Sequence, residues 1–117
     1  MVQTWVEDDG TTLFQSLAIL EYLEETHPEP PLLPKDAKAR AWVRGFAMIN
    51  AADSHPLIVP RIRHYLEDTL KLGEEQRFAW IRHWLGLGLA AMATQLGRSP
   101  HAGKFCHCDA PTMADIC

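Results

Sequence analysis

A proline-rich segment at residues 28–34 constrains the fold more than any other part of this sequence. A proline lacks the N–H group that a helix interior needs, and its ring clashes with the preceding turn. Four of the eight prolines lie in this segment, which reads Pro28-Glu29-Pro30-Pro31-Leu32-Leu33-Pro34. It predicts a stiff linker, bounded here as residues 28–35, that separates a short N-terminal part from a longer C-terminal part.

The part before the linker, residues 1–27, predicts a β-hairpin followed by one helix. Strand-forming residues fill positions 2–6 and 11–14, and the turn signal Asp9-Gly10 lies between them. A lone hairpin is marginally stable, so it has to pack on another element. The helix begins near Gln15-Ser16 and ends at His27-Pro28. Its apolar face is predicted to contain Leu17, Ile19, Leu20 and Leu23, with Glu21, Glu24 and Glu25 toward water.

The part after the linker predicts a helical domain. Asp36 has the side chain of an N-cap, and a helical pattern runs from it to Asn50. The run Asp53-Ser54-His55-Pro56 interrupts or kinks this helix, and Pro60 perturbs the chain again before the next one. Gly73 is predicted to close that helix in the left-handed conformation.

Residues 74–96 form the longest helical pattern. Apolar residues recur at intervals of three and four, and a second apolar stripe lies beside the first. A helix that is apolar over so much of its circumference is usually buried, so this one is predicted to be the core helix. The first stripe consists of Phe78, Ile81, Leu85, Leu89, Met92 and Leu96. The second consists of Trp80, Trp84, Leu87 and Ala91.

Close to the last residue, Thr112-Met113-Ala114-Asp115 has the form of a capping box, the motif that satisfies the first free N–H groups of a helix. Only Ile116 and Cys117 follow it. Two interpretations stay open: a frayed turn, or a match to part of a longer protein.

Composition excludes several classes of function. The chain has 117 residues, a net charge of -4 and 47% hydrophobic residues, which is typical of one globular domain. Nucleic acid is disfavoured as a partner because binding phosphates needs a concentrated basic patch. Arginines at 40, 44, 61, 63 and 82 are diluted by acidic residues, so a membrane-binding surface is disfavoured too. We expect no signal peptide and no membrane span.

The three cysteines, Cys106, Cys108 and Cys117, are crowded near the C-terminal end and do not form a disulfide framework, which favours a reducing cytoplasm. The run Cys106-His107-Cys108 lacks a second ligand pair at zinc-site spacing, so no metal site is predicted.

Several of these motifs together resemble the zeta-class glutathione transferases, the group of the maleylacetoacetate and maleylpyruvate isomerases. The most specific match is residues 15–25, followed by His27-Pro28 and Pro31-Leu32-Leu33-Pro34. The similarity continues through residues 53–57, 82–84, 88–91 and 109–117 and covers nearly the whole chain.

The resemblance implies a mainly α fold, a helical bundle like the C-terminal domain of a glutathione transferase, with a short N-terminal β-hairpin. In that family a thioredoxin-like domain precedes the helical domain. Residues 1–27 are then the remnant of the first domain, residues 28–35 the linker, and residues 36–117 a truncated helical domain.

The resemblance also implies site residues. Gln15 and Ser16 correspond to the pair that holds the γ-glutamyl end of glutathione, where the free N–H groups of a helix N-terminus favour a carboxylate. Taken alone, Ser16 is better explained as a helix cap, and the resemblance reverses that preference. His55 matches a position that contacts glutathione or substrate, and Arg61 matches a basic residue near the substrate.

The chain departs from the family pattern at three places, and each departure argues against the family's catalytic activity in this chain. The serine- and cysteine-containing catalytic motif has no counterpart, so no catalytic residue is predicted. Val2-Gln3 stands where the family has a Val-Pro pair with a cis bond, and a cis bond before Gln3 would cost about 2.5–4 kcal/mol. Ile58-Val59-Pro60 is apolar where the family usually carries amides.

Two hypotheses of function follow from this resemblance. One is a non-catalytic helical domain that forms a homodimer or another oligomer through the apolar residues left exposed. The alternative is a glutathione-dependent cis-trans isomerase or transferase that works as an assembled oligomer. We favour the first, because isomerisation needs a stabilised thiolate, for which the sequence offers no residue.

Overall fold

The structure is a computed structural model and describes residues 3–117. It begins with an antiparallel hairpin of β1 (Thr4–Val6) and β2 (Thr12–Phe14), in which Trp5 lies opposite Leu13. The turn is closed by the Gly10 N–H donating to the Glu7 carbonyl at 2.9 Å, and Gly10 has a φ of 85°, a conformation that glycine adopts without strain. The predicted hairpin is confirmed within these residues. The expectations about Val2 and the Val2-Gln3 bond lie outside the described residues.

The helix α1 (Ser16–Thr26) follows the hairpin, and the linker after it contains no helix or strand. The predicted N-cap of the next helix, α2 (Ala37–Met48), is confirmed, because the Asp36 carboxylate accepts a hydrogen bond from the Ala39 N–H at 2.9 Å. That bond satisfies one of the donors that every helix N-terminus leaves free.

The predicted interruption after α2 is confirmed and takes a defined form. The chain continues from α2 into a π-helical segment, η1 (Ile49–Ser54), and then a 3-10 turn, η2 (His55–Leu57). Pro60 then begins α3 (Pro60–His64), which passes into a second π-helical segment, η3 (Tyr65–Thr69). Pro56 and Pro60 account for the break, since neither can donate a backbone hydrogen bond.

The prediction that Gly73 closes this helix in the left-handed conformation is wrong. Lys71 has the positive φ, 54°, whereas Gly73 has a φ of -65° and forms the N-cap of the next helix, α4 (Glu74–Arg98). Glycine favours a left-handed cap but does not require one. The predicted capping box at Thr112 is confirmed, and it opens a short helix, α5 (Met113–Ile116).

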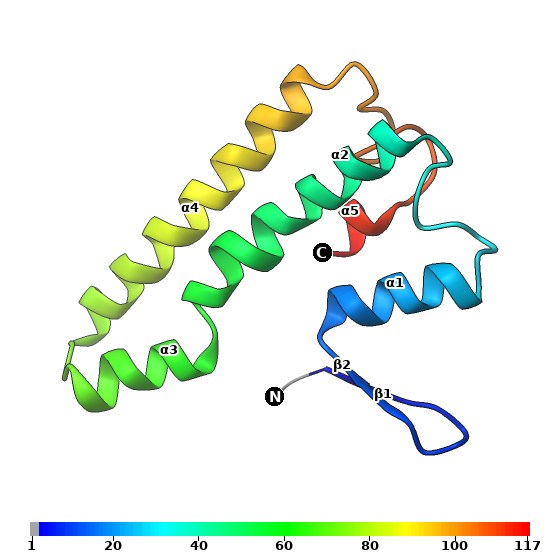
Figure 1. Cartoon of the computed structure of the whole chain (residues 1–117). Helices are drawn as coiled ribbons and strands as arrows, with labels where there is room; N and C mark the ends of the chain where they lie inside the picture. Colours follow the sequence, from blue (N-terminus) through cyan, green and yellow to red (C-terminus); the bar gives the residue numbers. More distant parts are fainter. Residues whose placement is uncertain (1–2) are drawn as a thin grey trace.

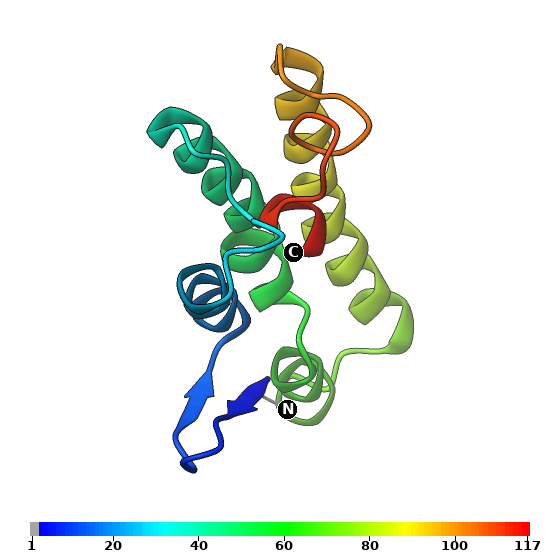
Figure 2. The same cartoon turned by 90° about the vertical axis from the view of Figure 1, so that its right-hand side faces the viewer.

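The long helices α2 and α4 run side by side in opposite directions, while α1 and the hairpin lie on the side of α2 away from α4 (Figure 1). Viewed from the side, α5 lies between α2 and α4 (Figure 2). The molecule extends over 48 × 44 × 19 Å, so its thin dimension is about two helix diameters. Its radius of gyration is 16.9 Å, against about 13 Å for a compact chain of this length.

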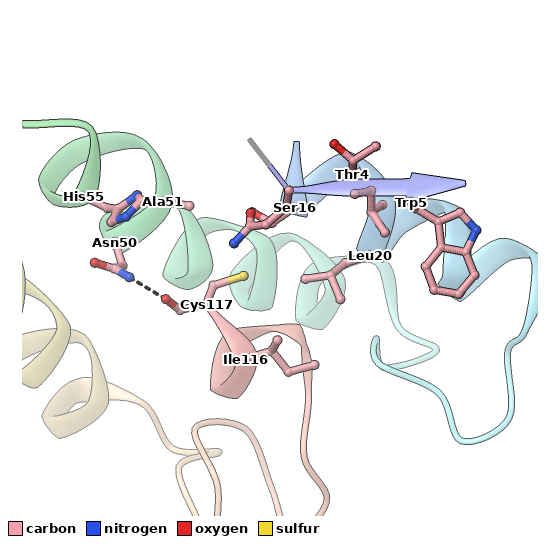
Figure 3. A pocket seen from close by; sticks show the side chains of 11 residues that line it. Thr4, Trp5, Ser16, Leu20, Asn50, Ala51, His55, Ile116 and Cys117 are labelled. Carbon is pink, nitrogen blue, oxygen red and sulfur yellow. Dashed lines mark hydrogen bonds between the residues drawn. The ribbon is translucent and has the colours of Figure 1, made fainter. Parts of the chain in front are cut away.

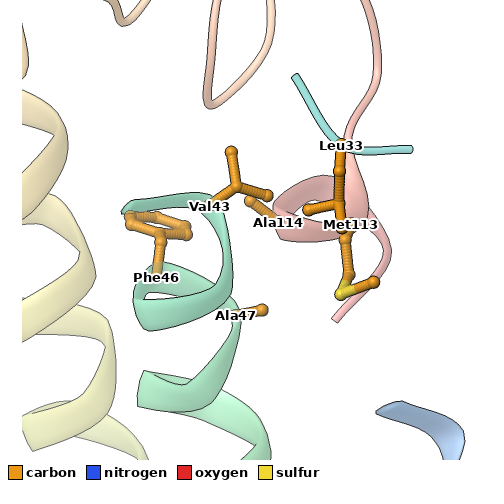
Figure 4. Packing of buried hydrophobic residues seen from close by; sticks show 6 residues of the cluster. All are labelled: Leu33, Val43, Phe46, Ala47, Met113 and Ala114. Atoms are coloured by element: carbon orange, nitrogen blue, oxygen red, sulfur yellow. The ribbon is translucent and has the colours of Figure 1, made fainter. Parts of the chain in front are cut away.

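The core lies where α2 meets α5 and the linker. Val43, Phe46 and Ala47 of α2 are buried against Met113 and Ala114 of α5, with Leu33 of the linker completing the cluster (Figure 4). The Met113 N–H also donates to the Leu32 carbonyl at 2.8 Å, which ties α5 to the linker. The short last helix is therefore a central part of the core rather than a frayed turn.

The prediction that residues 74–96 form the core helix is wrong. Gly88 is the buried residue of α4 in the described chain, whereas Phe78 is 49% exposed and Leu89 57% exposed. The apolar pattern did predict a helix. It could not predict burial, which depends on which other elements cover the helix.

The prediction that Glu24 points toward water is also wrong. Glu24 is buried, because its carboxylate accepts a hydrogen bond from the Leu32 N–H at 2.6 Å and pairs with Arg40 of α2 at 3.4 Å. One turn earlier, Glu21 accepts two hydrogen bonds from Arg44, at 2.5 and 2.7 Å. These ion pairs join α1 to α2 across the linker.

Candidate functional site

A cavity of about 420 Å³ lies between the N-terminal part and the helical part of the molecule (Figure 3). The hairpin, the start of α1, the segment η1 and the end of α5 all contribute to its wall. The eleven side chains that line it are those of Gln3, Thr4, Trp5, Ser16, Ile19, Leu20, Asn50, Ala51, His55, Ile116 and Cys117.

The N-terminus of α1 opens at this cavity. Gln15 is the N-cap residue and has φ 72° and ψ 119°, which is a strained conformation for any residue other than glycine. Its carbonyl accepts the first hydrogen bond of the helix, from the Ile19 N–H at 3.0 Å. The N–H groups of the first turn have no partner within the helix, so this end of α1 can bind an anion.

The opposite wall comes from η1. A π-helix is wider than an α-helix, and such segments are frequent at functional sites. Here it directs Asn50 and Ala51 toward the cavity, with His55 at its end. The His55 N–H donates to the Asn50 carbonyl five residues earlier, which is the defining bond of this helix type.

The end of α5 forms the third wall. The Asn50 side-chain amide donates to the backbone oxygen of Cys117 at 2.5 Å, and the Cys117 thiol points into the cavity (Figure 3). Burial raises the pKa of the Cys117 thiol. A thiol with a raised pKa is a poor nucleophile, because the thiolate is the reactive form.

The structure brings two of the four predicted site residues together. Ser16 and His55 both line the cavity, from opposite walls. Gln15 precedes Ser16 and is not among the lining residues. Arg61 is exposed on α3, outside the cavity wall.

Sequence reasoning did not identify Asn50, Ala51 or the residues at the end of α5 as parts of this cavity. The predicted break at residues 53–56 was the available signal, since π-helical irregularities within helices are frequent at functional sites. The contribution of Cys117 depends on how α5 packs, for which the sequence carries no comparable signal.

The chemistry of the cavity is that of a hydrogen-bonding site with little charge. His55 and Cys117 are the ionisable residues among those that line it. In residues 3–117, no three side chains of His, Cys, Asp or Glu are grouped as metal ligands would be. None of the helices over the same range has both the length and the apolar character needed to cross a membrane.

Comparison with known proteins confirms the resemblance as a partial match. No protein-family model matches the chain. A maleylpyruvate isomerase of Ralstonia sp is 42% identical over 94% of this chain and 52% of its own length. The maleylacetoacetate isomerase of Methylobacterium extorquens AM1, solved with bound malonate and GSH, is 41% identical with a TM-score of 0.94, covering 99% of this chain and 54% of that one.

A maleyl pyruvate isomerase, described as a bacterial glutathione S-transferase of the zeta class, is 38% identical with a TM-score of 0.92, covering 97% of this chain and 53% of that one. The chain spans about half the length of the curated relatives it matches. The similarity to zeta-class glutathione transferases is thus shown over nearly the whole chain, together with the mainly α fold.

Proposed function

We propose that this chain is a glutathione-binding helical domain of the zeta-class glutathione transferase type, which is non-catalytic alone and associates with a second copy of itself. In this proposal, residues 1–27 correspond to part of a thioredoxin-like domain, residues 28–35 to the linker and residues 36–117 to a helical domain of the glutathione transferase type. Three free cysteines make the reducing cytoplasm the expected compartment.

The observation that carries glutathione binding is the strained N-cap of α1 beside a cavity. A non-glycine residue in this conformation costs on the order of 1–3 kcal/mol, and such strain is concentrated at ligand sites. In the proposed complex, Gln15 and Ser16 hold the γ-glutamyl carboxylate at the helix N-terminus, and His55 contacts the ligand from the opposite wall. The solved relative with bound GSH supports the choice of ligand.

The proposal that the chain is non-catalytic alone is supported by the residues that line the cavity. Glutathione-dependent isomerisation needs a group that stabilises the thiolate of glutathione. Among the described residues that line the cavity there is no lysine or arginine to pair with a thiolate, and the Cys117 thiol has a raised pKa. No catalytic residue is therefore assigned.

Self-association is supported by an apolar surface on α4 that no other element of the described chain covers. Phe78, Leu85 and Leu89 recur on one side of α4 and are all exposed. Together with the thin, extended shape of the molecule, this leaves a stripe that a second copy can bury. Native mass spectrometry is expected to show a dimer, and Leu89→Lys is expected to shift it toward the monomer. A wild-type chain that is monomeric at high micromolar concentration would refute self-association.

Calorimetry with glutathione tests the binding site. Ser16→Ala removes a hydroxyl at the rim of the cavity and is expected to weaken glutathione binding about fivefold, the loss of one hydrogen bond of about 1 kcal/mol. Ser99→Ala, at the far end of α4, is the matched control and should leave the affinity unchanged. Equal affinity for wild type and Ser16→Ala, or no binding to wild type, would refute the assignment.

The alternative function is a glutathione-dependent maleylacetoacetate or maleylpyruvate isomerase that acts as an assembled oligomer, favoured by the names of relatives about 40% identical. In this proposal Arg61 binds a carboxylate of the diacid substrate. The test is turnover of a maleyl diacid with glutathione at increasing chain concentration. Activity that rises more steeply than the concentration, and falls in Arg61→Gln, would support the alternative. Absence of turnover at every concentration would exclude it.

A further inference from the structure

The π-helical segment η1 separates two cavities. One face contributes Asn50 and Ala51 to the candidate site described above. The other contributes Ile49, Asp53 and Ser54 to a second cavity of about 270 Å³, whose opposite wall is α4. A change in how α4 packs on η1 can therefore reach the candidate site through η1 itself.

Ser54 is the residue of η1 that links the two sides. It is 3% exposed, and its hydroxyl lies 3.1 Å from the side-chain oxygen of Asn50 and 3.3 Å from the Ile49 carbonyl, both of which can accept its proton. With its oxygen held by Ser54, the Asn50 amide directs its NH₂ group to the backbone oxygen of Cys117, at 2.5 Å. An asparagine side chain has one acceptor end and one donor end, so fixing the first fixes the direction of the second.

Gly88 of α4 sets the position of Ser54. A Cβ atom added at Gly88 would lie 2.6 Å from the Ser54 hydroxyl oxygen and 2.7 Å from the Ser54 Cβ. The Ser54 Cβ is fixed by the backbone of η1, so a side-chain rotation cannot relieve that contact. Gly86, one half-turn earlier on α4, has no atom within 4 Å of the corresponding position.

We infer that Gly88 and Ser54 are positioning residues for the candidate site: Gly88 seats Ser54 against α4, Ser54 orients the Asn50 amide, and Asn50 holds the wall formed by Ile116 and Cys117. The identity of the ligand rests on the function proposed above. The positioning of the wall does not, because it concerns contacts between α4, η1 and α5 alone.

The first test compares alanine at the two glycines of α4. Gly86→Ala should raise the melting temperature, because alanine is the better helix former. Gly88→Ala should lower it and should expose the Cys117 thiol, so that iodoacetamide labels Cys117 at least about tenfold faster, as read by peptide mapping. The labelling rate of Cys108, which is exposed and does not line the cavity, is the internal control and should not change.

The second test separates positioning from packing. Ser54→Ala keeps the Cβ that packs on Gly88 and removes the hydroxyl, so it should lower the melting temperature less than Gly88→Ala does, while Cys117 labelling accelerates. The double variant Ser54→Gly with Gly88→Ala removes both clashing atoms. It should recover the melting temperature and keep fast labelling of Cys117, because Asn50 is no longer oriented.

The outcomes of these tests are distinguishable from those of the function proposal. A labelling rate of Cys117 that is the same in Ser54→Ala and wild type would overturn the positioning inference, whatever glutathione does. Faster labelling with no glutathione binding in wild type would support the positioning and refute the ligand. Where glutathione does bind, Ser54→Ala should weaken it at least about threefold, and an unchanged affinity would count against the inference.

Discussion

The α2–α5 core and the helix α4 differ in burial, and the difference is the reverse of what their apolar content predicts. The longer helix, α4, has two apolar stripes, yet Gly88 is its buried residue among residues 3–117. The much shorter α5 has four residues, of which Met113 and Ala114 are buried against Val43 of α2. Apolar content predicted the helices correctly and ranked their burial in the wrong order.

The α4 helix therefore carries more apolar surface than the described part of the chain covers. Its neighbour on one side is mainly η1, and its outer side faces no other element of the described chain. A surface of this kind is typical of an element that is buried in an assembly.

Replacing one buried and one exposed apolar side chain tests most directly which of the two regions forms the core. Met113→Ala removes a side chain that is 1% exposed and should cost about 2–5 kcal/mol of unfolding free energy. Leu89→Ala on α4 should change the same quantity by less than about 0.5 kcal/mol in dilute solution. Urea denaturation measures both. A larger cost for Leu89→Ala than for Met113→Ala in dilute solution would contradict the assignment of the core.

The N-caps of the two long helices provide a second comparison between α2 and α4. The α2 helix begins with the Asp36 side chain bound to the Ala39 N–H, whereas α4 begins with Gly73, whose N–H is bound by the Gln76 side chain at 3.0 Å. Asp36→Ala should cost about 1 kcal/mol of unfolding free energy, because it leaves a helix donor without its partner. Gly73→Asp should gain only a few tenths of a kcal/mol. Thermal denaturation gives both, and a neutral Asp36→Ala would show that α2 does not depend on its cap.

The smallest effect concerns the ion pair that joins α1 to α2. Hydrogen bonds from Arg44 hold the pKa of Glu21 below its ordinary value of 4.5. The resulting stability is present above pH 4.5 and is lost as the pH falls through the lowered pKa, since the folded state then has to bind the proton. The pair is partly exposed, so Glu21→Gln should cost about 0.2–1 kcal/mol at pH 7 and nothing at pH 2.

Denaturation of wild type and Glu21→Gln at several pH values checks this last prediction. The difference between the two curves should shrink as the pH falls. A difference that stays constant from pH 7 to pH 2 would mean that packing, and not the ion pair, accounts for the effect of the substitution.

Much of the local structure was predictable because it is determined by neighbouring residues. The hairpin follows from the Asp9-Gly10 turn, α2 from the Asp36 cap, and α5 from the capping box at Thr112. The break at Pro56 was predictable too, but its form was not. Proline lacks a backbone donor and therefore predicts that the helix is interrupted. The widening of the helix into η1 depends instead on how the segment packs against α4.

The candidate site was predictable only in part. Ser16 and His55 entered through a resemblance between motifs, and both line the cavity. Asn50 and Cys117 were not predicted, because they are 67 residues apart in the chain and meet only when α5 returns to α2. The prediction that Glu24 points toward water failed for the same reason, since its partners Leu32 and Arg40 reach it through the turn of the linker.

Local sequence was sufficient to predict where most helices begin, where they break and which family of proteins the chain is similar to. These properties depend on turn chemistry, capping side chains and backbone donors within a few residues of one another. Three other properties depend on how the elements pack: which apolar helix is buried, which carboxylate leaves water and which residues share a cavity. Burial is a property of pairs of surfaces, and a periodic pattern describes only one surface of each pair.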